Sequence, residues 1–138
     1  MIGLLIIAHG DLGKTLIQSA THVLGAAPAR VASIAVVGRA DPDALLRDVK
    51  QQISVLDDGS GVLLLTDMLG GTPSNVATRA LVPGRVDGVC GASLPMVVRA
   101  LTYRHAPLAT VVVKATSGGL EGVGHLIPAS TPHATSGN

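Results

Sequence analysis

Three short runs of aliphatic residues set the strongest limit on how this chain folds. They cover residues 2–8 (IGLLIIA), 31–37 (VASIAVV) and 62–66 (VLLLT). Each run is almost continuously apolar instead of alternating with polar residues, and each is too short to span a membrane as a helix. Continuous apolar runs of this length are typical of strands that are buried on both faces of a parallel sheet. The chain therefore needs helices that cover both faces of its sheet.

The segments between these runs carry apolar residues at helical spacing. Residues 11–25, for example, place Leu12 and Leu16 on one face. Two later helices begin with a capping residue followed by proline, and these capping residues are Asp41 and Thr72. The expected helices cover residues 11–25, 42–56, 72–81 and 94–104, and a fifth starts at Pro107 and fades at Gly118 and Gly119.

Two further segments complete the expected sheet. Residues 86–92 (VDGVCGA) form a fourth strand, and residues 123–128 (VGHLIP) form a short last strand. Strands that alternate with helices imply an α/β fold, here a three-layer sandwich with a mainly parallel central sheet. No linker divides the chain, so residues 1–128 are expected to form one domain. Residues 129–138 (ASTPHATSGN) are expected to form a disordered tail.

The composition argues against several kinds of partner and site. A net charge of +1 over 138 residues creates no strong electric field, and Tyr103 is the single aromatic residue. Neither phosphate attraction nor base stacking therefore favours nucleic acid as a partner. Cys90 stands alone, which rules out an internal disulfide and favours a reducing compartment. Without metal-ligand spacing or a nucleotide-binding loop, we expect neither a metal nor a cofactor.

Two ionisable residues follow two of the buried runs. His9 follows the first run in the sequence AHG, and Asp67 follows the third in TDMLGGTPSN. The working crevice of an open parallel sheet lies at the carboxyl ends of its strands, so the two side chains face one another if their strands are neighbours. The Asp67 carboxylate would then accept the hydrogen of one ring nitrogen of His9. The other ring nitrogen would remain unprotonated and nucleophilic.

The glycine-rich stretch after Asp67 has the features of an anion site. The amides of Gly70, Gly71 and Thr72 precede a helix, where free N–H groups and the helix dipole attract anions. The hydroxyls of Thr72 and Ser74 add further donors. Phosphoryl transfer depends mostly on positioning and charge stabilisation, so the two loops together predict a phosphate-binding site at which His9 carries the phosphate.

Each of these features also has a structural explanation. A histidine at the end of a strand is often a packing residue, and an aspartate there often caps a turn. The stretch GGTPSN, taken alone, is a turn followed by a capped helix. A domain that binds an anion without ever forming a phosphohistidine is therefore a second interpretation of the same residues.

Three motifs together resemble a known family. AHG after the first strand, TDMLGGTPSN after the third and GASLPM before the fourth helix are similar to the EIIA domain of the mannose family of the bacterial phosphotransferase system (PTS). This resemblance covers the chain from Met1 to about Pro128. It implies a cytoplasmic phosphotransferase component in which His9 accepts a phosphoryl group from the protein HPr and passes it to an EIIB domain, which serves an EIIC/EIID permease. Asp67 matches the carboxylate partner of the phosphorylated histidine.

The resemblance also implies details of architecture. The strand order in the family is 2-1-3-4, and a short antiparallel strand at the carboxyl end is exchanged between the subunits of a homodimer. Such an exchange gives a reason for the isolated segment 123–128. Met68 and Leu69 are apolar residues in a loop, and we expect them to dock on HPr and on the EIIB domain.

Two departures from the family leave the biological role open. Ser93 stands in GASLPM where relatives commonly carry Asn. The sequence also contains an EIIA-like domain without a fused EIIB domain, whereas some relatives carry both. The alternative to a sugar-transport carrier is a regulatory module, in which the phosphorylation state of His9 controls a partner protein without sugar transport.

Overall fold

A parallel sheet of four strands forms the centre of the computed structural model, which describes residues 1–129. The strands are β1 (Gly3–His9), β2 (Val31–Val36), β3 (Val62–Thr66) and β4 (Val86–Cys90). They lie in the order β2-β1-β3-β4, and each neighbouring pair is parallel. The predicted α/β class, the parallel sheet and the strand order are therefore confirmed.

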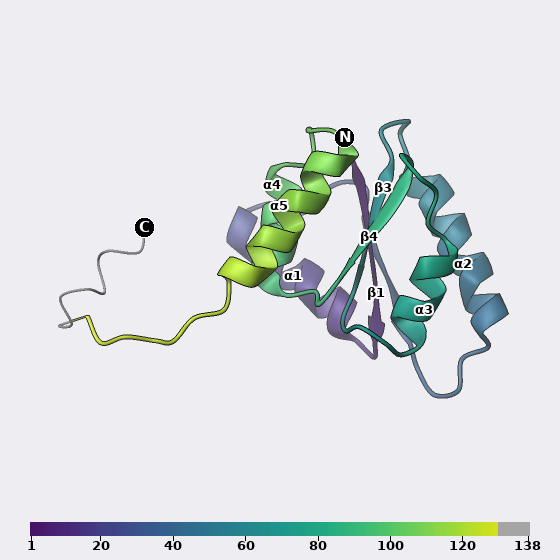
Figure 1. Cartoon of the computed structure of the whole chain (residues 1–138), viewed down its shortest axis with the longest axis horizontal. Coiled ribbons are helices and arrows are strands. Elements are labelled where there is room, and N and C mark those ends of the chain that lie inside the picture. Colours follow the sequence, from purple (N-terminus) through teal and green to yellow (C-terminus); the bar gives the residue numbers. More distant parts are fainter. Residues whose placement is uncertain (130–138) are drawn as a thin grey trace.

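Helices cover both faces of this sheet (Figure 1). On one face lie α1 (Leu12–Leu24), α4 (Leu94–Thr102) and α5 (Leu108–Glu121), and on the other lie α2 (Pro42–Leu56) and α3 (Thr72–Arg79). Asp41 caps α2 as its sequence predicts, since its Oδ1 accepts a hydrogen bond of 3.1 Å from the Asp43 amide. Among the described residues, no helix is both long and apolar enough to cross a membrane. The three-layer arrangement is the one that the aliphatic runs require.

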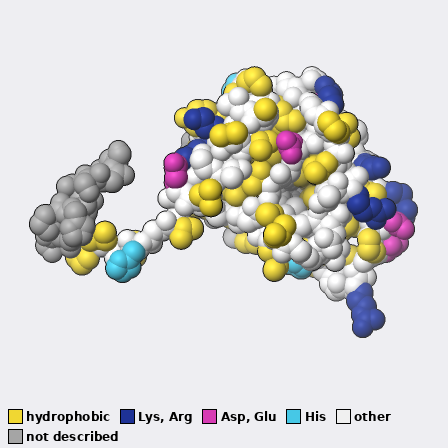
Figure 2. Space-filling view, in the orientation of Figure 1, with side chains coloured by type: hydrophobic (Ala, Val, Ile, Leu, Met, Phe, Trp, Pro, Cys, Tyr) yellow, Lys and Arg dark blue, Asp and Glu magenta, His cyan; other side chains and the backbone are white. Residues whose placement is uncertain are grey.

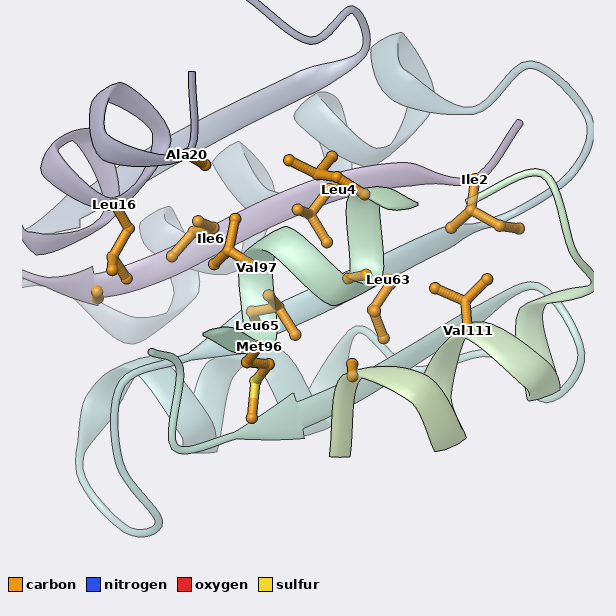
Figure 3. Packing of buried hydrophobic residues seen from close by; sticks show 14 of the residues in the cluster. Ile2, Leu4, Ile6, Leu16, Ala20, Leu63, Leu65, Met96, Val97 and Val111 are labelled. Atoms are coloured by element: carbon orange, nitrogen blue, oxygen red, sulfur yellow. The ribbon is translucent and has the colours of Figure 1, made fainter. Parts of the chain in front are cut away.

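The aliphatic strands supply two separate hydrophobic cores. Successive side chains of a strand point to opposite faces, so Leu4 and Ile6 join the core beneath α1, α4 and α5, while Leu5 and Ile7 join the core beneath α2 and α3. Figure 3 shows Leu4 and Ile6 in the first core together with Val97 of α4. This double burial explains why β1 is apolar at nearly every position.

The last helix differs from the prediction. We expected it to fade at Gly118 and Gly119, but α5 continues to Glu121. The two glycines instead allow α5 to pack closely on α4: a Cβ at Gly118 would lie 2.9 Å from Cβ of Arg99, and one at Gly119 would lie 2.7 Å from Cε of Met96. Contact with α4 therefore outweighs the low helix propensity of glycine.

The third helix begins and ends slightly differently from the prediction. Thr72 was expected to cap it, but Thr72 is its first residue and Gly71 occupies the capping position with φ of 84°. The helix ends at Arg79, before the expected end at residue 81. These shifts place Gly71, which has no side chain, at the point where the loop turns into the helix.

The predicted last strand is not formed within this chain. Residues 123–128 are exposed and belong to no strand, and the segment extends away from the body of the molecule after α5 (Figure 1). An exchanged strand acquires its pairing partners from a second copy, so the exchange stays a prediction. Nearly all of the predicted tail, residues 130–138, lies outside the described residues, and the boundary between domain and tail is likewise untested.

Candidate active site

The parallel pairing of β1 with β3 brings the two ionisable residues together. Ile7 pairs with Thr66 at the carboxyl ends of these strands, so His9 and Asp67 leave the sheet at the same edge. The Nδ1 atom of His9 lies 2.7 Å from Oδ2 of Asp67. A residue near the start of the chain and one near its middle thus form a single hydrogen-bonded pair.

Both carboxylate oxygens of Asp67 are engaged. Oδ2 also accepts a hydrogen bond of 3.0 Å from the His9 amide, and Oδ1 accepts one of 3.0 Å from the Met68 amide. Burial opposes ionisation of this carboxyl, but the hydrogen bonds from the amide and ring of His9 and the charge of His9 outweigh it and lower the pKa of Asp67. Asp67 is therefore a carboxylate at neutral pH.

This pairing determines which ring nitrogen of His9 is free. A carboxylate can only accept hydrogen bonds, so Nδ1 must carry the hydrogen that lies between the two side chains. In the neutral ring, Nε2 then holds the unprotonated lone pair. The side chain of His9 is 51% exposed whereas that of Asp67 is 10% exposed, so the ring is accessible and its partner is sheltered. The arrangement suits nucleophilic attack by Nε2 on the exposed side of the ring, while the sheltered Asp67 carboxylate is hydrogen-bonded to Nδ1.

The glycine loop lies against the free side of the ring. Gly70 and Gly71 have φ of 76° and 84°, a left-handed conformation that glycine adopts without steric cost. A Cβ on Gly71 would lie 3.5 Å from Cε1 and 3.9 Å from Nε2 of His9. A side chain there would occupy space beside the free nitrogen. The glycine leaves that space to a group bound at Nε2.

The start of α3 supplies charge complementarity at the same place. The first N–H groups of a helix have no acceptor within the helix, and they carry its positive dipole end. No side chain caps α3, because Gly71 holds the capping position and Thr72, half-buried, follows as the first helical residue. These features favour an anion near His9, as the sequence pattern predicts.

Ser74 lies differently from the sequence prediction, which counted its hydroxyl among the donors to the phosphate. The residue is only 9% exposed, and its hydroxyl donates to the carbonyl of Met68 inside the loop. The Oγ atom also lies 2.6 Å from Oγ1 of Thr66. The Ser74 hydroxyl therefore points inward, away from solvent. The sequence did not predict a role for Thr66, because a threonine at the end of an apolar strand has no pattern that indicates its hydrogen-bond partner.

Three other sequence predictions concern the surroundings of the site. Met68 and Leu69 are 55% and 82% exposed, as loop residues available for docking would be. Ser93, which stands where relatives commonly carry Asn, caps α4: its Oγ accepts a hydrogen bond of 3.4 Å from the Met96 amide. Among residues 1–129, no cluster of His, Cys, Asp and Glu side chains has the geometry to hold a metal ion.

Comparisons of the sequence connect the chain to the PTS. A family model described as "PTS system fructose IIA component" matches residues 3–116. The chain is 31% identical over 125 residues to the PTS system mannose-specific EIIAB component of Escherichia coli strain K12. That match covers 88% of this chain but 38% of the relative, so the chain spans well under half the length of that protein.

A second kind of relative is regulatory. The transcriptional regulatory protein LevR of Bacillus subtilis is 31% identical over 68 residues, which is 49% of this chain and 7% of the regulator. This match is shorter than the match to the EIIAB component. It shows that sequences of this kind also occur within a much longer regulatory protein.

Solved structures share the fold over most of its length. An EIIA component from Streptococcus agalactiae has a TM-score of 0.80 at 24% identity and covers 91% of this chain and 97% of its own. A mannose/sorbose-specific IIA subunit from Enterococcus faecalis has a TM-score of 0.83 at 21% identity, with 94% and 98% covered. The shared fold agrees with the sequence comparisons. The family model spans most of the sequence and the EIIAB component is 31% identical, so this chain belongs to the mannose-type EIIA family of the PTS.

Proposed function

We propose that this protein is a cytoplasmic phosphocarrier that accepts a phosphoryl group from HPr on His9 and passes it to an EIIB domain. The observation that carries the proposal is the hydrogen bond of 2.7 Å between Nδ1 of His9 and Asp67. It directs the lone pair of the neutral ring to Nε2, the nitrogen beside Gly71. Membership of the EIIA family supports the choice of HPr and EIIB as donor and acceptor.

The transfer needs only the groups already described. The lone pair of Nε2 attacks the phosphorus of the donor, an N–P bond forms, and the bond from phosphorus to the donor's leaving atom breaks with its electron pair going to that atom. The His9 ring becomes positively charged, and the Asp67 carboxylate stabilises that charge through the hydrogen on Nδ1. The N–H groups of the loop and of α3 face the phosphoryl oxygens. Transfer to the EIIB domain reverses these bond changes with a new nucleophile.

A phosphorylation assay tests the proposal. The protein is incubated with Enzyme I, HPr and labelled phosphoenolpyruvate, and the product is tested for stability in acid and base. We expect one label per chain that is lost in acid and survives base, as a phosphohistidine does, and no label in His9→Ala. Full labelling of His9→Ala would overturn the assignment, whereas an unlabelled wild-type protein would favour a domain that binds anions without a covalent intermediate.

A regulatory role is the second candidate. The match to LevR favours it, because that relative is named as a transcriptional regulator. In this case phosphorylation of His9 would select a partner protein, and the phosphoryl group would not continue to a sugar. Transfer from the labelled protein to a purified mannose-family EIIB domain separates the two roles. Rapid loss of label to EIIB supports the carrier with its EIIC/EIID permease, and a label that persists beside EIIB supports the regulator.

We also propose that the functional form is a homodimer tied by residues 123–128. In the described part of the chain, β4 lies at the edge of the sheet and pairs with β3, and on its other side only its first residue, Val86, is bridged, by Val82. Hydrophobic side chains gather over the face where Figure 1 shows β4 (Figure 2). Val123 and Leu126 are 83% and 92% exposed. An exchanged strand would bury such side chains and pair the open edge, which otherwise invites association.

A further inference from the structure

Two buried hydroxyl groups lie directly beneath the glycine loop. Thr66, the last residue of β3, is 4% exposed, and Ser74, in the first turn of α3, is 9% exposed. Their hydroxyl oxygens lie 2.6 Å apart, and the Ser74 hydroxyl also bonds the Met68 carbonyl. A chain of three polar groups therefore joins the end of a strand, the start of a helix and the loop between them.

The direction of these hydrogen bonds follows from the number of hydrogens. A hydroxyl has one hydrogen to donate, and a carbonyl oxygen has none. Ser74 must donate to Met68, because the Met68 carbonyl can only accept. The hydrogen between Thr66 and Ser74 must then come from Thr66. The Ser74 hydrogen is thus committed to the loop and unavailable to a phosphoryl group.

Met68 connects this chain to the catalytic pair. Its amide donates to Oδ1 of Asp67 at 3.0 Å, while Oδ2 of Asp67 holds His9. Its carbonyl is held from the other side by Ser74. The two residues that follow Leu69 are glycines in the left-handed conformation, which restrain the backbone little. On the amino-terminal side of the loop amides, the nearest restraint is therefore the set of hydrogen bonds made by Met68.

We propose that the Thr66–Ser74 hydroxyl pair positions the loop for phosphoryl transfer, by holding the Met68 carbonyl inward so that the amides that follow face Nε2 of His9. This inference rests on the proposed phosphocarrier function. Thr66 is itself anchored, since its carbonyl accepts a hydrogen bond of 2.9 Å from the Ala92 amide. Both hydroxyl residues line a cavity of about 190 Å³ that Leu69 also lines. The loop could move into that space once the hydrogen bond from the Ser74 hydroxyl to the Met68 carbonyl is lost.

Four variants test the positioning role. Ser74→Ala and Thr66→Val each remove one hydroxyl, Thr66→Ser retains it, and Thr78→Val is the matched control. The Thr78 hydroxyl also lies on α3 and lines the cavity, but it bonds the Ser74 carbonyl at 2.8 Å and not the loop. Phosphoryl transfer from HPr is measured by rapid quench over a range of HPr concentrations, and each variant is checked by thermal unfolding.

We expect the maximal transfer rate of Ser74→Ala to fall by about 10- to 100-fold, the scale of a slightly misplaced catalytic geometry. The HPr concentration at half-maximal rate should change less than the maximal rate, because the docking side chains of Met68 and Leu69 are retained even if their loop shifts. Thr66→Val should lose less, and Thr66→Ser should restore the rate. The amide resonances of Gly70 and Gly71 should shift in Ser74→Ala and not in Thr78→Val.

A double substitution tests whether the two hydroxyls act as one unit. If Thr66 acts only through Ser74, adding Thr66→Val to Ser74→Ala should cause no further loss of rate. Additive losses would show that Thr66 does not act through Ser74. Wild-type rates with unshifted Gly70 and Gly71 resonances would overturn the positioning role while leaving the phosphocarrier function intact. A wild-type protein that HPr does not label would overturn the proposed function, and the inference with it.

Discussion

At the scale of single residues, the site depends on a histidine whose free nitrogen is selected by its neighbour. The two side chains belong to different strands, and the ring is exposed while the carboxylate is sheltered. Asp67 uses both of its oxygens, one toward the ring and amide of His9 and one toward the loop amide of Met68. One carboxylate therefore links the proposed nucleophile to the loop of the proposed anion site.

The first prediction at this scale concerns Asp67→Asn. The amide side chain keeps the size of aspartate but can present an N–H to the ring, so His9 would adopt the other tautomer and lose a partner for its positive charge. We expect the transfer rate from HPr to fall by on the order of 10²- to 10⁴-fold. Rapid-quench kinetics measure the rate. Asp48→Asn, which alters an exposed carboxylate of α2, is the matched control.

A wild-type rate in Asp67→Asn would show that the carboxylate only caps the turn. Asparagine is also a good turn residue, so in that case neither rate nor stability would change appreciably. Circular dichroism on both variants separates loss of function from loss of fold.

A second prediction concerns the exposed loop residue Met68. A charge placed in an apolar docking patch must be desolvated on binding, so Met68→Asp should slow phosphorylation by HPr by about tenfold or more at limiting HPr. Its melting temperature should stay nearly unchanged, since the side chain is 55% exposed. Val55→Asp is a matched control, because Val55 is a 63% exposed apolar residue near the other end of the fold, in the last turn of α2. Equal rates for the two variants would remove Met68 from the interface.

At the scale of elements, close contact between α4 and α5 depends on glycine. We predict that Gly118→Ala destabilises the protein relative to Gly119→Ala, although both substitutions raise helix propensity by about 1 kcal/mol. The new methyl at residue 118 would meet the Cβ of Arg99 at 2.9 Å and the Pro95 carbonyl at 3.2 Å, which cannot move without shifting α4. At residue 119 it would meet the flexible end of Met96, which can move aside.

Urea unfolding measures the difference between the two glycine variants. Overpacking typically costs about 1–3 kcal/mol, so Gly118→Ala should be the less stable of the pair by about that amount. Equal midpoints would mean that the two helices separate easily, and that the glycines serve no packing role.

At the scale of the whole molecule, the open edge of β4 and the exposed segment after α5 both point to a second copy. We predict that deleting residues 122–138 converts a dimer into a less stable monomer, because the exchanged strand and its apolar side chains are lost. Deleting only residues 130–138 is the control and should change neither property. Multi-angle light scattering gives the mass, and thermal unfolding gives the stability. A dimer that survives the longer deletion would refute the exchange.

How much of this could be predicted from the sequence depends on how local the signal is. Strands β1 and β3 were predictable, because a strand buried on both faces must be apolar at nearly every position. The start of α2 was predictable too, since Asp41 and the proline after it act within one turn. The end of α5 was not predictable, because two successive glycines are typical of a helix end and only their contact with α4 explains why the helix continues. The strand predicted at residues 123–128 is absent from the single chain and stays a prediction, because its pairing partners would come from a second copy.

The candidate site divides in the same way. The amino-acid sequence was enough to predict that a histidine and a carboxylate end two buried strands beside a glycine-rich helix start, since burial, strand ends and helix starts are encoded by neighbouring residues. The position of Gly71 beside Nε2 of His9 and the inward turn of the Ser74 hydroxyl to Met68 depend instead on how the folded chain packs. A side chain chooses its hydrogen-bond partner among all groups within reach, and those groups come together only when distant segments pack.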